Sequence, residues 1–294
     1  MVVETNPPLV FPGPGYLRLV LRRLSVMIAA MLLIGCGQSE ENLAIVASSP
    51  GTIGTATEQR VLMGLVNLET GDSLATPDLD VTATFTGPGE QVVQVPTEFL
   101  WTIEDVRGLY VARVTLDSPG TWSVQLQPAG MGSTPATPFA VVDDVVVPEV
   151  GEAAPAVATS TSADHALEEI STDPNPDPAF YALSLDDALA NGRPTAVIFA
   201  TPAFCQSQTC GPLLDQVQTL SGDHPGVNFL HIEIYENLDA TSFDELRTVP
   251  AVTEWRLPSE PWVFFMDKDG VVTARLEGAA SEDEIHAALL SIGG

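Results

Sequence analysis

Apolar and polar positions alternate along several short stretches in the first half of the chain. In residues 79–87, Val81, Ala83 and Phe85 fall on one face and three threonines fall on the other. Alternation with a period of two, bounded by Gly, Pro and Asp, is typical of half-buried β-strands. Helical periodicity does not intervene, so the pattern predicts an antiparallel, Ig-like β-sandwich over residues 58–147. The predicted strands are 61–68, 79–87, 108–116, 120–128 and 138–147.

The pattern changes to alternating helices and strands over residues 179–294. Apolar, β-branched runs predict strands, and helical segments separate them. The last helix opens with a capping-box sequence at residues 281–284. The order strand, helix, strand, helix, hairpin, helix predicts an α/β fold. The strands are expected at 194–201, 227–236, 262–267 and 271–278, and the helices at 184–190, 212–220, 243–248 and 281–290.

Two segments follow neither period. Residues 37–57 are small and polar, which predicts a tether. Residues 148–178 are rich in Pro, Ala, Ser and Thr, which predicts a flexible linker between the β-domain and the α/β domain.

Residues 24–34 form an apolar run of 11 residues that follows Arg22 and Arg23. The run is too short to span a bilayer, and its basic flank is typical of a secretory signal. It ends in residues 33–36 (LIGC), which resemble the bacterial lipobox. That resemblance implies that residues 1–36 form a lipoprotein signal segment, that Cys36 is lipidated, and that the mature protein is anchored to the outer side of a cell membrane. The alternative is an ordinary signal peptide with an incidental cysteine.

The chain has three cysteines. If lipid occupies Cys36, then Cys205 and Cys210 remain as one pair. Such a division favours an oxidising or redox-active compartment outside the cytoplasm.

The predicted β-domain carries residues 108–110 (GLY) and 119–122 (PGTW). These resemble the closing hairpin of small extracytoplasmic Ig-like modules, including the YtkA-like group. The resemblance implies no catalytic motif, and Tyr110 and Trp122 are expected to be core residues rather than a ligand platform.

The α/β domain resembles the thioredoxin family in three features. An apolar strand runs into residues 202–205 (PAFC), a helix continues through residues 212–215, and residues 260–264 (EPWVF) occupy the position of the family's cis-proline and hairpin strand. The resemblance implies a cis bond at Pro261, with Pro258 as the alternative. It also implies redox chemistry at the cysteines.

The cysteine spacing departs from the family, because four residues separate Cys205 from Cys210 instead of two. Residues five apart on a regular helix point in different directions, so a disulfide requires a turn over residues 206–209. Two alignments remain: Cys205 is the nucleophile with Cys210 as resolving thiol, or residues 210–212 (CGP) take the place of the family's motif. The family's buried acidic base is missing from the strand before Cys205.

The sequence therefore predicts a membrane-anchored thioredoxin-like protein that exchanges thiols and disulfides with exported proteins through Cys205 and Cys210. The alternatives are an extracytoplasmic binding module with a structural disulfide, or a copper-handling protein of the same fold. Phe204, Trp255 and Trp262 are candidates for the wall of a substrate groove, although packing beneath the proline loop explains the two tryptophans equally well.

The net charge and the positions of the histidines bear on which partners and metals the protein could bind. The formal net charge is −28, and the part from Cys36 onward is more acidic still, which disfavours nucleic acid as a partner. His224, His231 and His286 do not converge on the cysteines in the sequence pattern, so each is interpreted as a solvated or core histidine. No metal site and no cofactor are expected.

Overall fold

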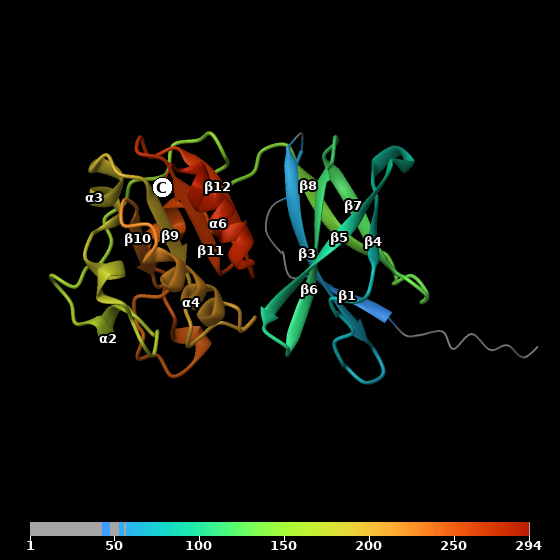
Figure 1. Ribbon diagram of the computed structural model, residues 1–294, viewed down its shortest axis with the longest axis horizontal. Helices are drawn as coiled ribbons and strands as arrows, with labels where there is room; N and C mark the ends of the chain where they lie inside the picture. Colours follow the sequence, from blue (N-terminus) through green and yellow to red (C-terminus); the bar gives the residue numbers. More distant parts are fainter. Residues whose placement is uncertain (1–42, 48–52, 56, 294) are drawn as a thin grey trace, which may run out of the picture. The chain divides into compact units, whose positions relative to one another are not determined.

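The computed structural model describes residues 43–47, 53–55 and 57–293, and these belong to one compact unit. The predicted signal segment with Cys36, and the first part of the predicted tether, lie outside the described residues. Within the described ranges, the helices are too short or too polar to cross a membrane. The fold is mostly β, with two sheets and several helices (Figure 1).

The first sheet has eight strands in the order β1-β3-β6-β5-β4-β7-β8-β2. Neighbouring strands are antiparallel, except that β2 and β8 are parallel. The strands are β1 (Leu43–Ala47), β2 (Ile53–Gly54), β3 (Glu58–Asn67), β4 (Val81–Thr86), β5 (Val92–Ile103), β6 (Arg107–Thr115), β7 (Gly120–Pro128) and β8 (Thr137–Val142), with a 3-10 turn η1 (Pro88–Glu90) before β5.

Strand β5 joins the two halves of this sheet. Residues 92–96 of β5 pair with β4, and residues 97–103 pair with β6. The sequence pattern did not predict β5, because Pro96 lies in its middle and proline lacks the N–H that a central strand uses. Pro96 is the last residue that pairs with β4, so it lies where the strand changes partner.

One apolar core is shared by strands from both halves of the sheet. The predicted inward face of β4, Val81, Ala83 and Phe85, is buried. Tyr110 and Trp122 are each 1% exposed in the same core, which confirms that they are packing residues.

Gly108 at the start of β6 allows a close approach. A β-carbon there would lie 2.3 Å from the ring of Phe99, a distance that side chains do not tolerate. The glycine of the GLY sequence therefore makes room for a neighbouring aromatic side chain.

The second sheet has four strands in the order β10-β9-β11-β12. Strands β9 (Thr195–Phe199) and β10 (Asn228–Ile232) are parallel, whereas β11 (Trp262–Met266) and β12 (Val272–Glu277) form the predicted antiparallel hairpin. In the turn of this hairpin, Gly270 N donates to the Asp267 carbonyl.

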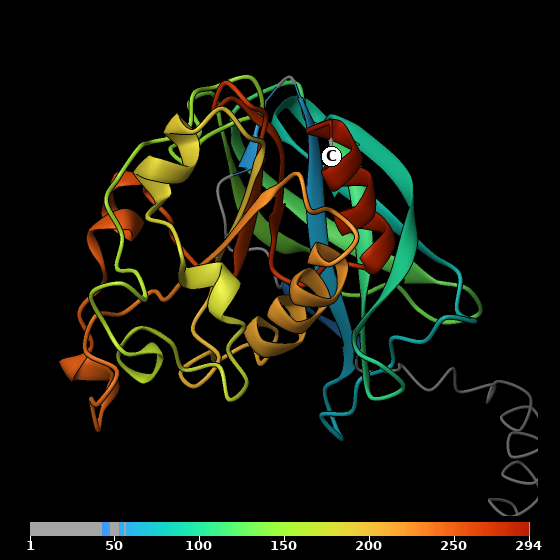
Figure 2. The same ribbon diagram turned by 60° about the vertical axis from the view of Figure 1, so that its left-hand side comes forward.

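Helices cover both faces of this four-stranded sheet (Figure 2). Ala196 and Ile198 of β9 pack with α4 (Cys210–Ser221) and α6 (Glu282–Ser291). Val197 and Phe199 face the other way and pack with α3 (Leu185–Ala190) and α5 (Pro250–Glu254). Strand β9 is buried on both sides, as its continuous apolar sequence predicts.

Local details agree with the sequence at some helix ends and differ at others. The capping box is present, because Ser281 Oγ accepts from Glu284 N and the Glu284 carboxylate accepts from Ser281 N. The helix predicted over 243–248 is only a 3-10 turn, η3 (Phe243–Glu245), and α5 follows it after the extended residue Val249.

The two predicted spacer segments are more ordered than their composition suggests. Within 37–57, β1 pairs with β3 along its whole length, and Leu43 is 2% exposed. Within 148–178, residues 151–154 run beside the start of β12: Gly151 N donates to Val272 O, and Ala154 N donates to Gly270 O. They also contain α2 (Leu167–Ile170), and η2 (Pro178–Tyr181) follows.

The prediction of a flexible linker over residues 148–178 therefore does not describe residues 151–154, which are paired with the second sheet. Backbone groups of residues 151–154 hydrogen-bond to the second sheet and its hairpin turn, and Ala154 and Val157 pack against its core. The composition of the segment does not predict this pairing, because backbone hydrogen bonds need no particular side chain. The domain boundaries themselves stay predictions.

Candidate functional site

The two cysteines that follow β9 are joined by a disulfide. The Cα atoms of Cys205 and Cys210 are 6.1 Å apart, within the range that a disulfide bridges. The chain between them turns: Gln208 N donates to the Cys205 carbonyl, and Gln208 itself has a φ of 60°. The turn that the four-residue spacing requires is present.

The two sulfur atoms have different surroundings. Cys210 is fully buried, whereas Cys205 is partly exposed. Cys210 is also the first residue of α4, and its backbone N–H points at Cys205 Sγ at 3.3 Å. A second polar neighbour, Ser207 Oγ, lies 3.3 Å from the same sulfur. An N–H group and the positive end of a 12-residue helix favour a thiolate at Cys205 over one at Cys210.

A carboxyl group lies against the buried sulfur. Glu260 Oε2 is 3.6 Å from Cys210 Sγ and accepts a hydrogen bond of 2.7 Å from Thr201 N. Burial raises the pKa of Glu260 to about 7, although hydrogen bonds from Thr201 act in the opposite direction. A carboxyl with this pKa takes up and releases protons near neutral pH.

Glu260 was not predicted from the sequence because it lies 50 residues beyond Cys210, outside the strand where the thioredoxin family carries its acidic base. The available signal was its position directly before Pro261. The Glu260–Pro261 bond is cis, as the sequence predicts.

A second buried carboxyl belongs to Glu233, directly after β10. Its side chain accepts hydrogen bonds from both N and Oγ1 of Thr172, and the residue is 4% exposed. Burial and, to a smaller extent, the negative charge of Glu260 raise the pKa of Glu233, hydrogen bonds from Thr172 and Thr201 oppose the rise, and the resulting pKa is about 7. The site therefore contains two carboxyls that disfavour each other's ionisation.

His231 lies beneath this site as a hydrogen-bonded core residue. Its Nε2 donates to the Ala200 carbonyl at 2.9 Å, so Nδ1 accepts from the Tyr181 hydroxyl at 2.6 Å. Burial lowers the pKa of His231 to about 4, and the ring is neutral at pH 7. The interpretation of His231 as a core histidine is confirmed.

Aromatic side chains extend from the cysteine loop. The Phe204 ring contacts those of Tyr235 and Phe243 edge to face, with centroids 6.2 and 6.4 Å apart. Phe243 is 56% exposed. A cavity of about 850 Å³ lies next to this group and is lined by Tyr235 and Glu233, among others. Phe204 is thus placed on an accessible aromatic surface next to Cys205, and the sequence had not pointed to its two partners.

Trp255 and Trp262, which were predicted as candidates for the wall of a substrate groove, lie in the core. Trp255 is fully buried and Trp262 is 3% exposed, and both pack in the core on the α3 and α5 face of the second sheet. Cys210 belongs to the core on the opposite face. Trp255 Nε1 is bonded to the Pro155 carbonyl. The assignment of these tryptophans to a substrate groove is therefore corrected: they pack beneath the proline loop.

The remaining histidines lie elsewhere. His224 and His286 face each other with ring centroids 5.9 Å apart, between the end of α4 and α6. Across the described part of the chain, His, Cys, Asp and Glu side chains do not gather in groups of three that could hold a metal ion.

Comparison with known proteins gives structural likenesses only. No family model matches the sequence, and no curated protein matches it. Similar solved structures include DsbF of MTB in mixed oxidized and reduced forms, at 16% identity over 38% of this chain and 89% of that chain, with a TM-score of 0.29. Another is a protein named thiol:disulfide interchange protein DsbE from Chlorobium tepidum, at 12% identity over 50% of this chain and 99% of that chain, with a TM-score of 0.33.

A third likeness is to the Lin-41 filamin domain, at 16% identity over 36% of this chain and 96% of that chain, with a TM-score of 0.24. All three scores are below 0.5. The function proposed below therefore rests on the geometry of the cysteine site.

Proposed function

We propose that this protein is a thioredoxin-like, extracytoplasmic thiol–disulfide exchange protein, anchored to a membrane by lipid on Cys36, that acts on exported proteins. The observation that carries the proposal is the asymmetry of the disulfide. Cys205 is partly exposed and receives an N–H from the start of α4, whereas Cys210 is buried against a carboxyl with a pKa near 7. A disulfide that only fastened a loop would need neither feature.

The exchange begins at Cys205. In the reduced protein the Cys205 thiolate attacks one sulfur of a substrate disulfide, which forms a mixed disulfide and releases the other substrate sulfur as a thiolate. The N–H of Cys210 and the helix end lower the free energy of the attacking thiolate. The exposed aromatic surface of Phe204 and Phe243 supports binding of an unfolded polypeptide.

The second step resolves the mixed disulfide. Cys210 loses its proton to the Glu260 carboxylate, attacks Cys205 Sγ, and releases the second substrate thiolate. The substrate disulfide has then been reduced by two electrons to a dithiol. The protein has been oxidised, and its two cysteines form the Cys205–Cys210 disulfide. The same steps in reverse oxidise a dithiol substrate.

The proposal is tested by trapping. Cys210→Ser removes the resolving thiol, so covalent complexes with exported proteins should accumulate and dissolve on addition of a reductant. Cys205→Ser is the matched control and should accumulate none. If neither variant forms complexes, or if Cys205→Ser forms as many as Cys210→Ser, the assigned order of attack is wrong.

A redox titration distinguishes exchange from a structural staple. Closure of so short a loop stabilises a fold by only about 2 kcal/mol. A reduction potential well below about −300 mV would mark the disulfide as structural. We expect a higher potential, in the range of catalytic dithiols.

A further inference from the structure

The basic residues of the first sheet all contact the α/β part of the chain. The chain carries a formal charge of −28, and residues 43–147 contain only three basic side chains: Arg60, Arg107 and Arg113. Each of them contacts a residue that follows position 200 in the sequence. Basic residues are rare in this acidic protein, and all three of the first sheet lie at its contact with the α/β part. We therefore treat this contact as a specific interface.

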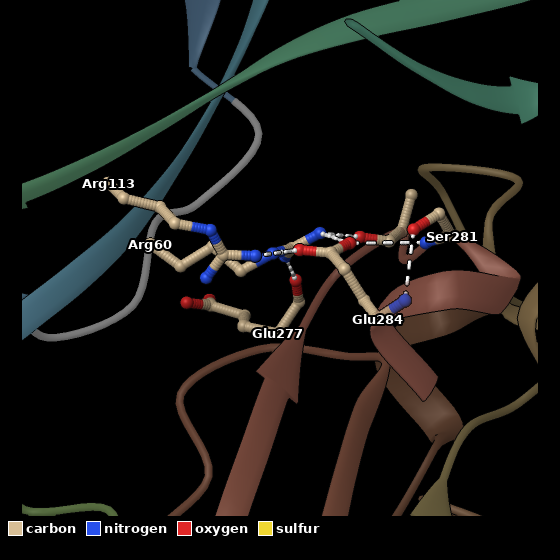
Figure 3. Close-up of polar contacts among 6 residues, drawn as sticks. Arg60, Arg113, Glu277, Ser281 and Glu284 are labelled. Carbon is tan, nitrogen blue, oxygen red and sulfur yellow. Dashed lines mark hydrogen bonds and ion pairs between the residues drawn. The ribbon is translucent and has the colours of Figure 1, made fainter. Parts of the chain in front are cut away.

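The centre of this contact is a bidentate ion pair (Figure 3). Arg60 Nε and Nη2 donate to the two carboxylate oxygens of Glu284 at 2.7 and 2.8 Å, and its remaining donors reach the Glu277 and Ala279 carbonyls. Arg113 Nη2 donates to the same Glu284 carboxylate at 2.7 Å. The side chains of Arg60 and Glu284 are only 11% and 12% exposed.

The ion pair is accompanied by apolar packing. Ala279, in the loop before α6, packs with Leu62 of β3, Leu100 of β5, and Leu109 and Val111 of β6. Ala279 is 4% exposed. These residues form a cluster of their own, separate from the core of the first sheet. The contact therefore has an apolar centre beside charged groups that are hydrogen-bonded in a fixed geometry.

The same docking brings the turn between β5 and β6 to the cysteine loop. Arg107 Nη1 donates to the Ser207 carbonyl at 3.5 Å, and Ser207 Oγ is 3.3 Å from Cys205 Sγ. Val106, next to Arg107, is 72% exposed. The β5–β6 turn therefore lies against the loop that carries Cys205.

We propose that the β5–β6 turn, held in place by the Arg60–Glu284 pair, is a wall of the thiol site that recognises polypeptide substrates. This inference rests on the proposed exchange function and assigns the first sheet a part in substrate selection. A substrate protein contacts the turn around Arg107 while its sulfur reacts at Cys205. A small disulfide reaches Cys205 without touching the turn.

The test compares a protein substrate with a small one in the full chain. The reduced protein is mixed with insulin, a protein disulfide, and separately with hydroxyethyl disulfide, which is small and uncharged. Arg107→Gln removes the guanidinium from the turn, and Glu284→Gln removes the charge of the ion pair while a glutamine can still complete the capping box. The matched controls are Arg193→Gln, an exposed arginine bonded to carbonyls elsewhere, and Glu282→Gln, an exposed acid on α6.

We expect both test variants to raise KM for insulin by about threefold to fivefold, the range of an interaction at the rim of an interface. Their rates with hydroxyethyl disulfide should stay within about twofold of the unsubstituted protein, and the controls should change neither reaction. An unchanged KM for insulin in Arg107→Gln, which keeps the ion pair, overturns the proposal. An equal loss with both probes also overturns it, because the turn would then only support the cysteine loop. If the unsubstituted protein reacts with neither probe, the exchange function fails and this inference fails with it.

Discussion

Replacement of Glu260 by glutamine should lower the pKa of the Cys210 thiol in the reduced protein. Glu260 Oε2 lies 3.6 Å from Cys210 Sγ. Above pH 7, where this carboxyl is ionised, a thiolate at Cys210 would form beside an existing negative charge. Glutamine keeps the shape of the side chain and removes that charge.

The separation of the two groups sets the size of the effect. Two unit charges at this distance repel by about 1 kcal/mol in water and by about 4 to 5 kcal/mol at an effective dielectric constant near 20. Since one pKa unit corresponds to about 1.4 kcal/mol, the Cys210 pKa should fall by between about 1 and 3 units.

The measurement is the pH dependence of alkylation by iodoacetamide. It is made on Cys205→Ser and on Cys205→Ser combined with Glu260→Gln, so that Cys210 is the reacting thiol. Glu254→Gln in the same background is the control, because Glu254 is exposed at the end of α5. If Glu260→Gln shifts the alkylation midpoint by less than about half a unit, or if Glu254→Gln shifts it equally, the close repulsion between the Glu260 carboxylate and the Cys210 thiolate is refuted.

Three further predictions concern stability and are checked by urea denaturation. The pKa of Glu233 is raised from 4.5 to about 7, so between these pH values the folded state holds a proton that the unfolded state releases. The free energy of unfolding should therefore fall by up to about 3 kcal/mol as the pH rises from about 4.5 to 7. Glu233→Gln should flatten that decline. Arg60→Met should lower the free energy of unfolding by about 3 kcal/mol, because it leaves the buried Glu284 carboxylate less well paired. Arg113→Met, at a side chain that is 41% exposed, should lower it by under about 1 kcal/mol. Equal losses would contradict the buried ion pair. Gly108→Ala should lower the free energy of unfolding by about 1 to 3 kcal/mol, because the added β-carbon would lie 2.3 Å from the Phe99 ring. Gly132→Ala, with open space around it, should lower it much less. An unchanged free energy in Gly108→Ala would refute the close approach.

Periodicity predicted most of the regular elements correctly. Strands β4, β7, β9, β11 and β12 and helices α3 and α6 lie within a few residues of their expected positions. These segments carry a clear period and clear end signals, such as the capping box at residues 281–284. The missed strands β1, β2 and β5 are short, have a weak pattern or contain a proline, and they form because neighbouring strands offer hydrogen-bond partners.

The sequence determined the candidate chemistry of this protein: a pair of cysteines, the turn that their spacing requires, and a proline placed to adopt the cis bond. It did not determine which groups surround the sulfur atoms. Glu260 is 50 residues from Cys210 in the chain, and Glu233 and Phe243 reach the site from still other segments. Only the folded sheet brings them together, since strand order decides which loops meet at one edge.

The same reason explains the placement of the tryptophans and of the arginines. Trp255 and Trp262 flank the proline loop in the sequence, but both lie in the core away from Cys210: alternation of side chains along β11 directs Trp262 there, and Trp255 reaches it from the end of α5. Arg60 and Glu284 are 224 residues apart, and no local pattern relates them. The sequence by itself specified which residues could react, and the tertiary structure decided which carboxyl and which arginine lie beside them, because side chains this distant in the chain meet only through packing.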